Sequence, residues 1–177
     1  MADARDYVAA ETLKGGLTAT VRALRSDDRD RVARAVGGLE RESIYFRLFS
    51  YRNELTEAAL DRIMSFDPDR TVVLLVTLVA GGEEIVIGSG RYMVSGPGIA
   101  EVAFVVEEDY HGRGIASRIL HHLAIVARGH GIATFEADVL AENKAMHKVF
   151  ARTGWPMQKR RDGGAVHITL ALPDDPS

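Results

Sequence analysis

A strand, a turn containing two glycines and a helix follow one another directly in the middle of this 177-residue chain. Residues 99–106 are almost entirely apolar and predict a strand, whereas residues 115–129 carry apolar residues at helical spacing. Between them lie Gly112 and Gly114, which can adopt the positive φ that a tight turn requires. Such a turn aims several backbone N–H groups and the positive end of the helix dipole at one point. The arrangement therefore predicts a binding site for a phosphate or pyrophosphate group.

Composition narrows the classes of protein that the chain can represent. Its length suits one domain with a full core, and its net charge of −3 without a basic tract argues against a nucleic-acid partner. The absence of cysteine excludes disulfides, thiolate zinc sites and a cysteine nucleophile. No signal-like or membrane-length apolar run is present, and the adjacent His121 and His122 point apart on a helix, unlike a metal-binding pair. We expect a cytoplasmic monomer or homodimer with no metal and no membrane contact.

The patterns along the chain predict an α/β (α+β) domain built around one largely antiparallel sheet. We expect a flexible N-terminal segment over 1–16, the domain over 17–172 and a loose tail over 173–177. Apolar runs predict strands at 17–24, 71–79, 85–94, 99–106, 134–140, 155–160 and 165–172. Helical spacing predicts helices at 26–36, 40–49, 57–66, 115–129 and 142–152, the first of them capped by Ser26.

The glycine turn alone leaves the phosphate ligand open. A mononucleotide P-loop would need Gly-x-x-x-x-Gly-Lys-Ser/Thr, which the chain lacks. The dinucleotide fingerprint needs a third glycine, and Ser117 stands at that place. The alternative is a purely structural role, in which the two glycines make a tight connection between strand and helix and bind no ligand.

A second segment favours one family. The sequence HGRGIA at 111–116, followed by ENKAMHKVFARTGW at 142–155, closely resembles the GNAT superfamily of acetyl-CoA-dependent N-acetyltransferases. That family carries an Arg/Gln-x-x-Gly-x-Gly/Ala pyrophosphate loop, and here His111 stands where Arg or Gln is usual. The resemblance implies the GNAT fold, a mixed and mostly antiparallel central sheet of about seven strands with helices on both faces. It also implies acetyl-CoA as the cosubstrate.

The resemblance can be narrowed to one group within the superfamily. The segments ESIYFRLFS at 42–50, FDPDR at 66–70, AEVAFVV at 100–106 and AENKAM at 141–146 look like the GNAT domain of bacterial Pat-type protein lysine acetyltransferases. This similarity implies a protein lysine as the acceptor amine. Those enzymes often carry an extra domain for which we expect no room in this chain. The resemblance therefore supports conclusions about the acyl-transfer core more strongly than conclusions about substrate identity and regulation.

Glu101 is the candidate general base. A lysine amine must lose its proton before it attacks a thioester, and a carboxylate is the expected proton acceptor. Glu101 shares a strand face with Ala103 and Val105, and we expect this apolar company to desolvate its carboxylate partly. The Pat-type resemblance puts the base at the same position. The alternative is a carboxylate at a solvated strand end, with Glu136 and Asp138 as secondary candidates.

The resemblance implies the remaining contacts with acetyl-CoA. The backbone of the strand should pair with the pantetheine arm, the glycine turn should hold the pyrophosphate, and Asn143 should contact the arm while also capping a helix. Phe150 occupies the position at which many GNAT enzymes carry a tyrosine that protonates the leaving thiolate. The predicted cofactor-binding residues are Phe104, Val105, Val106, His111, Gly112, Arg113, Gly114, Ile115, Ala116, Ser117, Asn143 and Phe150.

Other functions remain open at this stage. A small-molecule amine is the alternative acceptor. A non-catalytic acyl-CoA sensor would keep the glycine turn without needing a base, and a nucleotide-binding module would bind ATP or NAD in place of coenzyme A.

Overall fold

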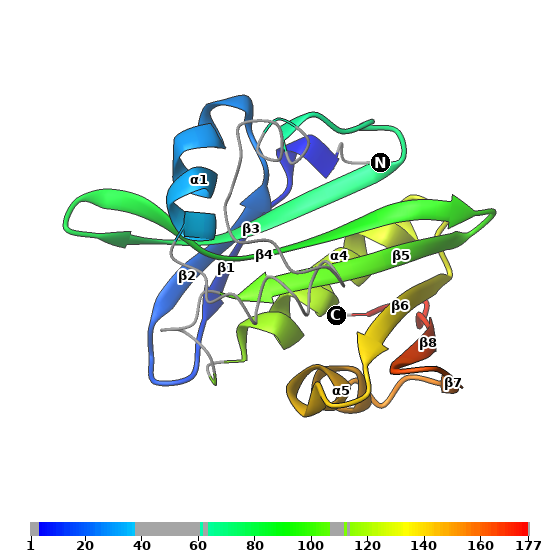
Figure 1. The fold of residues 1–177 in the computed structure, drawn as a ribbon. Helices are drawn as coiled ribbons and strands as arrows, with labels where there is room; N and C mark the ends of the chain where they lie inside the picture. The colour runs from blue at the N-terminus through cyan, green and yellow to red at the C-terminus, as the bar shows by residue number, and fades with distance from the viewer. Residues whose placement is uncertain (1–3, 38–60, 62–63, 107–111, 113, 177) are drawn as a thin grey trace.

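Eight strands form a single sheet across the computed structural model, which describes residues 4–37, 61, 64–106, 112 and 114–176 (Figure 1). The sheet order is β1-β2-β3-β4-β5-β6-β8-β7. All neighbours run antiparallel except β5 and β6, which are parallel. The fold is thus the mixed, mostly antiparallel α/β arrangement that the sequence predicts, with eight strands instead of about seven.

The elements have the following bounds. The strands are β1 (Val8–Thr12), β2 (Thr18–Ala23), β3 (Thr71–Ala80), β4 (Glu83–Gly96), β5 (Ile99–Val106), β6 (Thr134–Leu140), β7 (Met157–Asp162) and β8 (Ala165–Ala171). Two short 3₁₀ turns, Ala4–Asp6 and Ser26–Asp28, and three α-helices, α1 (Arg29–Gly37), α4 (Ile115–Gly129) and α5 (Lys144–Ala151), complete the described residues.

Most predicted elements are confirmed, because strong apolar patterns and turn residues mark their ends. The strands at 99–106 and 134–140 and the helix at 115–129 have the predicted bounds. The helix expected over 40–49 lies outside the described residues, and of the one expected over 57–66 the structure describes only residues 61 and 64–66, of which 61 and 64 are helical.

The segment over 1–16, for which the sequence predicts no regular element, contains a strand in the structure. β1 pairs with β2 from Val8 to Thr12, and Leu13 is buried in the main core. The strand VAAET has β-branched residues only at its two ends and Ala-Ala-Glu between them, so local propensity does not reveal it. The pairing with β2 and the contacts of its side chains create it.

Helices cover both faces of the sheet. Leu74 on β3 belongs to a large apolar core that includes most of the buried side of α4, whereas its neighbour Leu75 packs with Val32 of α1. Adjacent strand residues point to opposite faces, so α4 and α1 lie on opposite sides of the sheet. Phe150 of α5 belongs to the core on the α4 side. We call these two surfaces the α4 face and the α1 face.

Close packing of α4 on β4 depends on glycine. A β-carbon added to Gly90 would overlap the Ile119 side chain and would lie 3.0 Å from the Phe104 ring. At Gly88 the nearest atom would be a methyl group of Ile115, at 3.0 Å. The two glycines therefore let the helix approach the strand closely, which fixes where the N-terminus of α4 lies.

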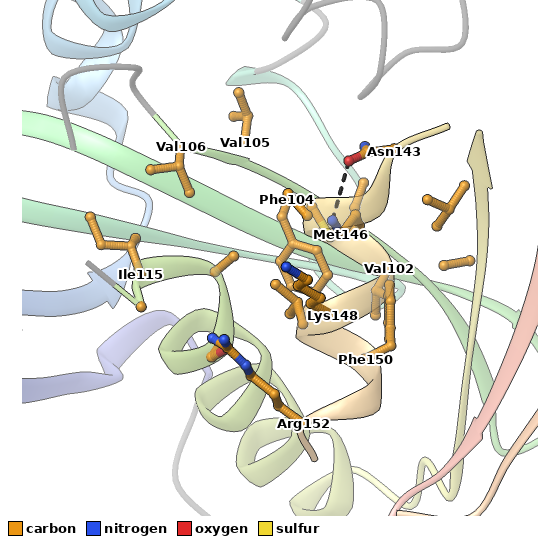
Figure 2. Close-up of a pocket in the computed structure, with 18 of the residues that line it drawn as sticks. Val102, Phe104, Val105, Val106, Ile115, Asn143, Met146, Lys148, Phe150 and Arg152 are labelled. Atoms are coloured by element: carbon orange, nitrogen blue, oxygen red, sulfur yellow. Dashed lines mark hydrogen bonds between the residues drawn. The ribbon is translucent and has the colours of Figure 1, made fainter. Parts of the chain in front are cut away.

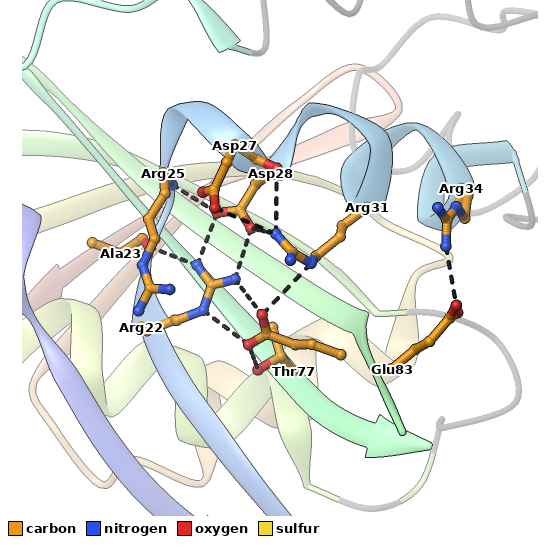
Figure 3. A network of polar contacts seen from close by, with 10 residues as sticks. Arg22, Ala23, Arg25, Asp27, Asp28, Arg31, Arg34, Thr77 and Glu83 are labelled. Atoms are coloured by element: carbon orange, nitrogen blue, oxygen red, sulfur yellow. Dashed lines mark hydrogen bonds and ion pairs between the residues drawn. The ribbon is translucent and has the colours of Figure 1, made fainter. Parts of the chain in front are cut away.

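A buried ion-pair network joins α1 to the sheet (Figure 3). The Arg22 guanidinium is 2% exposed and donates to both carboxylate oxygens of the fully buried Asp28, at 2.7 and 2.8 Å. It also donates to Glu84 on β4, at 3.0 and 3.1 Å. The Arg25 backbone N–H donates to Asp28 at 2.7 Å, so the Asp28 side chain caps the turn that leads into α1. The prediction that Ser26 is the cap is therefore wrong.

This network controls the protonation of its carboxylates. Burial by itself would raise the pKa of Asp28, but hydrogen bonds from Arg22 and from the Arg25 backbone, together with the Arg22 charge, leave that pKa below its usual range. A hydrogen bond from Arg22 likewise lowers the pKa of Glu84. Both groups thus stabilise the folded state when they are ionised.

Replacement of Gly90 tests the packing of α4 on β4. We expect Gly90→Ala to lower the free energy of unfolding by about 1–3 kcal/mol, because the new methyl group must displace the branched Ile119 side chain. Gly96→Ala on the same strand meets no atom within 4 Å and serves as the control. Urea denaturation of both variants makes the comparison. Equal midpoints for Gly90→Ala and the wild type would contradict the close approach.

Asp28→Asn tests the buried network. Removal of the charge leaves Arg22 buried without its main partner, and we expect a loss of about 3–5 kcal/mol in the free energy of unfolding. Because the folded-state pKa values of Asp28 and Glu84 are lowered, wild-type stability should be full above about pH 5 and should fall below the ordinary carboxyl pKa of about 3.9. Urea denaturation as a function of pH measures this slope.

The variant should show a shallower acid dependence than the wild type. Asp174→Asn is the matched control, since Asp174 also pairs with an arginine, Arg128, but is fully exposed. That control should leave the midpoint nearly unchanged. A loss in Asp28→Asn no larger than in the control would refute the role of the network.

Candidate active site

β5 and β6 separate halfway along their length and open a cleft. They pair only from Ile99 to Glu101, against residues 134–136. Beyond that point β5 continues to Val106 alongside β4, and β6 continues to Leu140 alongside β8. The cleft between them has a volume of about 470 Å³. Alternate peptide groups along the edge of β5 over residues 102–105 face the cleft and can pair with an extended ligand.

Residues from both faces of the sheet line the cleft. Val102 and Phe104, from the α4 face of β5, line it together with Ala103 from the α1 face. On β6, Val139 from the α4 face and Asp138 from the α1 face both contribute. A molecule bound on one side can therefore be reached by a second molecule from the other side.

The glycine turn closes one end of the cleft. Gly112 and Gly114 have φ of +80° and +79°, and Gly114 is the N-terminal cap residue of α4. A β-carbon at either glycine would meet no atom within 4 Å, so the backbone conformation and not the space requires glycine. Helix geometry leaves the N–H groups at the start of α4 without intrahelical acceptors, and the first three residues, 115–117, line the cleft.

α5 forms the opposite wall (Figure 2). Asn143 precedes it, and the side-chain oxygen of Asn143 accepts a hydrogen bond of 3.2 Å from the Met146 N–H, which confirms the predicted helix cap. The cap leaves the side-chain NH₂ group of Asn143 for other contacts. Further along the helix, the Phe150 ring is 2% exposed, with its centroid 6.0 Å from that of Phe104 on β5.

No phenolic hydroxyl lines the cleft among the residues that the structure describes. Phe150 supplies an aromatic ring without a proton to donate. Of the described tyrosines, Tyr92 is buried against Phe135 on the α4 face, and burial raises the pKa of its hydroxyl to about 12. Tyr7 contacts His122 on α4.

Glu101 stands at the last paired position before the strands separate. Its side chain lines the cleft and is exposed, so the predicted partial desolvation of this carboxylate is wrong. The reason is its place on the α1 face, where it points away from the apolar residues of the main core.

Two more carboxylates stand near Glu101 on the α1 face. Glu136 is the register partner of Glu101, and Asp138 follows two residues later on the same face of β6. His167 of β8 lies with its Nδ1 2.8 Å from Asp138 Oδ1 and its Nε2 3.6 Å from Glu136 Oε1. Of the two carboxylates, Asp138 lines the cleft.

The structure brings most of the predicted site residues together around this one cleft. Glu101, Phe104, Val105, Val106, Gly112, Gly114, Ile115, Ala116, Ser117, Asn143 and Phe150 all line it. His111 and Arg113, predicted from the loop resemblance, lie outside the described residues.

Sequence reasoning missed several lining residues. The cleft also has Arg91, Val102, Ala103, Ala137, Val139, Ala145, Met146, Lys148, Val149 and Arg152 in its walls. The members on α5 follow helical spacing from Asn143, which is a usable signal once one residue of that helix is assigned to the site. Arg91 is brought to the cleft by the pairing of β4 with β5 and has no such signal.

Two negative findings concern the described residues. They contain no group of three or more His, Cys, Asp or Glu side chains that could hold a metal ion. Nor do they contain a helix with the length and apolar character needed to cross a membrane.

Comparison with known proteins points to one family. The profile of the Acetyltransferase (GNAT) family matches residues 40–155. A protein of Pseudomonas aeruginosa that is named an acetyltransferase is 29% identical over 164 residues, which cover 92% of this chain and 88% of that protein.

Two further similarities concern Pat-type enzymes. The acetyltransferase Pat of Mycolicibacterium smegmatis is 36% identical over 134 residues, which cover 75% of this chain but only 39% of that enzyme. The crystal structure of the GNAT domain of S. lividans PAT superposes with a TM-score of 0.83 at 34% identity, covering 93% of this chain and 97% of that domain.

Gly114→Ala tests the role of the glycine turn. Alanine at φ +79° is strained, so we expect a modest loss of stability together with an approximately tenfold or greater weakening of acetyl-CoA binding, because the N–H groups at the start of α4 move out of line. Calorimetric titration with acetyl-CoA measures the affinity. Gly163→Ala carries the same type of strain, at φ +61° in the turn between β7 and β8, and should bind acetyl-CoA like the wild type. Equal affinities in the two variants would contradict a phosphate site at this turn.

Proposed function

Because the chain belongs to the GNAT family of acetyltransferases, we propose that it transfers the acetyl group of acetyl-CoA to the side-chain amine of a protein lysine, with Glu101 as the general base. The observation that carries this proposal is the position of Glu101. Its carboxylate lines the cleft at the point where β5 and β6 part, which is where a thioester held against the free edge of β5 would meet an amine from the α1 face.

The α4 side of the cleft suits acetyl-CoA. The glycine turn and the start of α4 offer backbone N–H groups for a pyrophosphate, and the edge of β5 over residues 102–105, which does not pair with β6, offers alternating donors and acceptors for the amides of a pantetheine arm. Asn143 lies across the cleft from that edge, with its NH₂ group free of the helix cap. The residues present thus fit an extended ligand with an anionic end.

The α1 side of the cleft suits a cationic amine. Glu101 and Asp138 line it there, and Glu136 stands beside them. An approaching lysine ammonium meets these carboxylates first, which raises its local concentration at the cleft. Arg91 also lines the cleft and limits the negative charge on this side.

Deprotonation of the acceptor is the main demand on the protein. With a solution pKa near 10.4, about one lysine in 2,500 is neutral at pH 7, which corresponds to roughly 4.6 kcal/mol. Acetyl-CoA supplies the acetyl group as a thioester that the neutral amine attacks directly. Glu101 accepts the ammonium proton, either directly or through one water, and its exposed carboxylate then returns that proton to solvent.

The leaving thiolate does not receive its proton from the side chain at position 150, because Phe150 has no hydroxyl. Solvent that enters from the α1 side of the cleft can supply it. The sulfur of coenzyme A has a low enough pKa to leave as the thiolate, so the absence of a phenol at this position is compatible with turnover.

Glu101→Gln is the central test. We expect kcat for a lysine-containing protein acceptor to fall about 10²–10⁴-fold at pH 7.5, because the amide cannot accept the proton. The difference in kcat between the variant and the wild type should become smaller as the pH rises toward 10, since a larger fraction of the acceptor amine is then neutral without a general base. Release of free thiol from acetyl-CoA, measured against a panel of proteins and small amines, gives the rates and the acceptor class together.

Glu83→Gln is the control for this experiment. Glu83 is the exposed first residue of β4 and pairs with Arg34 at 3.7 Å, and its replacement should leave turnover unchanged. Turnover on small amines but on no protein would overturn the lysine acceptor and leave the acetyltransferase. Turnover that survives in Glu101→Gln at pH 7.5 would overturn the assignment of the base.

A further inference from the structure

Two cationic side chains, Lys148 of α5 and Arg152 at its C-terminal cap, belong to the cleft but have no part in the transfer described above. Lys148 and Arg152 are four residues apart, and both line the cleft. Residues at this spacing lie on the same side of a helix. Figure 2 shows both side chains extending away from α5, with Arg152 reaching toward α4.

Their charges are not compensated by the described part of the chain. Lys148 and Arg152 are exposed, and no ion pair from either one to a described carboxylate is found. Other described arginines behave differently: Arg22, Arg29, Arg31, Arg34, Arg118 and Arg128 each pair with an aspartate or glutamate. In a chain with a net charge of −3, two unpaired cations side by side in a cleft favour an anionic ligand.

Their place in the cleft separates them from the acceptor. The carboxylates of Glu101 and Asp138 lie on the α1 face, whereas α5 packs on the α4 face through Phe150. The glycine turn and the first residues of α4 belong to this α4 side as well. Positive side chains and free N–H groups thus share the side on which the coenzyme would bind, and α4 and α5 face one another across it.

The N–H groups of one helix start suit one phosphate or pyrophosphate group. Coenzyme A carries, in addition to its pyrophosphate, a phosphate monoester on the ribose 3′ position with a charge of about −1.5 to −2 at neutral pH. A monoester of this charge is best held by a planar arginine fork together with a lysine ammonium. Building on the proposed function, we propose that Lys148 and Arg152 form a subsite for the 3′-phosphate of coenzyme A.

This subsite has a consequence for ligand choice. It distinguishes coenzyme A from 3′-dephospho-coenzyme A and from nucleotides that carry a pyrophosphate but no 3′-phosphate. The distinction weakens as salt concentration rises, because both cations are exposed to solvent.

The test compares the affinities of coenzyme A and 3′-dephospho-coenzyme A by calorimetric titration. The wild type should bind coenzyme A at least about tenfold more tightly than 3′-dephospho-coenzyme A. Lys148→Gln and Arg152→Gln should each lose roughly three- to tenfold in affinity for coenzyme A and keep their affinity for the dephospho compound. The double variant should bind the two compounds equally. Lys144→Gln, on the same helix but outside the lining of the cleft, should keep the wild-type ratio.

The possible results separate the two proposals. Equal affinities of the wild type for both compounds, or a ratio that persists in the double variant, would overturn the subsite and leave the acetyltransferase function intact. A parallel loss of both affinities in the variants would also overturn it, since the cations would then serve the pyrophosphate. Failure of the wild type to bind either compound would instead overturn the proposed use of acetyl-CoA.

Discussion

The separation of β5 from β6 after Glu101 is the constraint on which the site depends. A fully paired sheet would use every backbone group of residues 102–105 internally and would leave no gap between the strands. Because the two strands part, one edge of β5 keeps free hydrogen-bonding groups in the middle of the molecule. The contact between Phe104 and Phe150 places α5 beside that edge, so the gap is bounded by apolar packing on the α4 face and by charged side chains on the α1 face. The same break in pairing therefore creates the binding surface for one partner and the route of approach for the other.

The position of α4 is the second fixed point, because its first turn supplies the anion site. Gly90 lets the helix approach β4 closely, and a polar contact ties the same helix to the N-terminal strand. The buried His122 lies 2.6 Å through Nε2 from the Glu11 carboxylate and 2.6 Å through Nδ1 from the Tyr7 hydroxyl. Since an ionised carboxylate only accepts, Nε2 donates to Glu11, and the Tyr7 hydroxyl is the hydrogen-bond partner of Nδ1. Both histidine nitrogens are thus satisfied inside the fold, and this side chain orders β1 and α4 relative to one another instead of binding a ligand.

Charge is distributed unevenly around the cleft, with cationic groups on one side and carboxylates on the other. Backbone N–H groups, Lys148 and Arg152 stand on the α4 side, and Glu101 and Asp138 stand on the α1 side. An anionic acyl donor and a cationic amine are therefore favoured on opposite sides of one sheet, and each is disfavoured at the other's place. The buried Arg22–Asp28 pair has a different role, since it lies away from the cleft lining and joins the turn before α1 to the sheet.

The sequence by itself determined the elements with strong local patterns and the residues on them. The strand at 99–106, the two glycines and the helix at 115–129 could be predicted because apolar periodicity and positive-φ glycine turns are local properties, and the same segments carried the resemblance to acetyltransferases. Tertiary structure decided what pairing and packing over long sequence distances control. Only it could show that β1 joins the sheet, that Glu101 is exposed on the α1 face, and that Arg91, Lys148 and Arg152 reach the cleft. The physical reason is that these features depend on contacts between residues far apart in the chain, which no local pattern encodes. They include the strand order, the point at which β5 and β6 part and the choice of side chains that face one another across the gap.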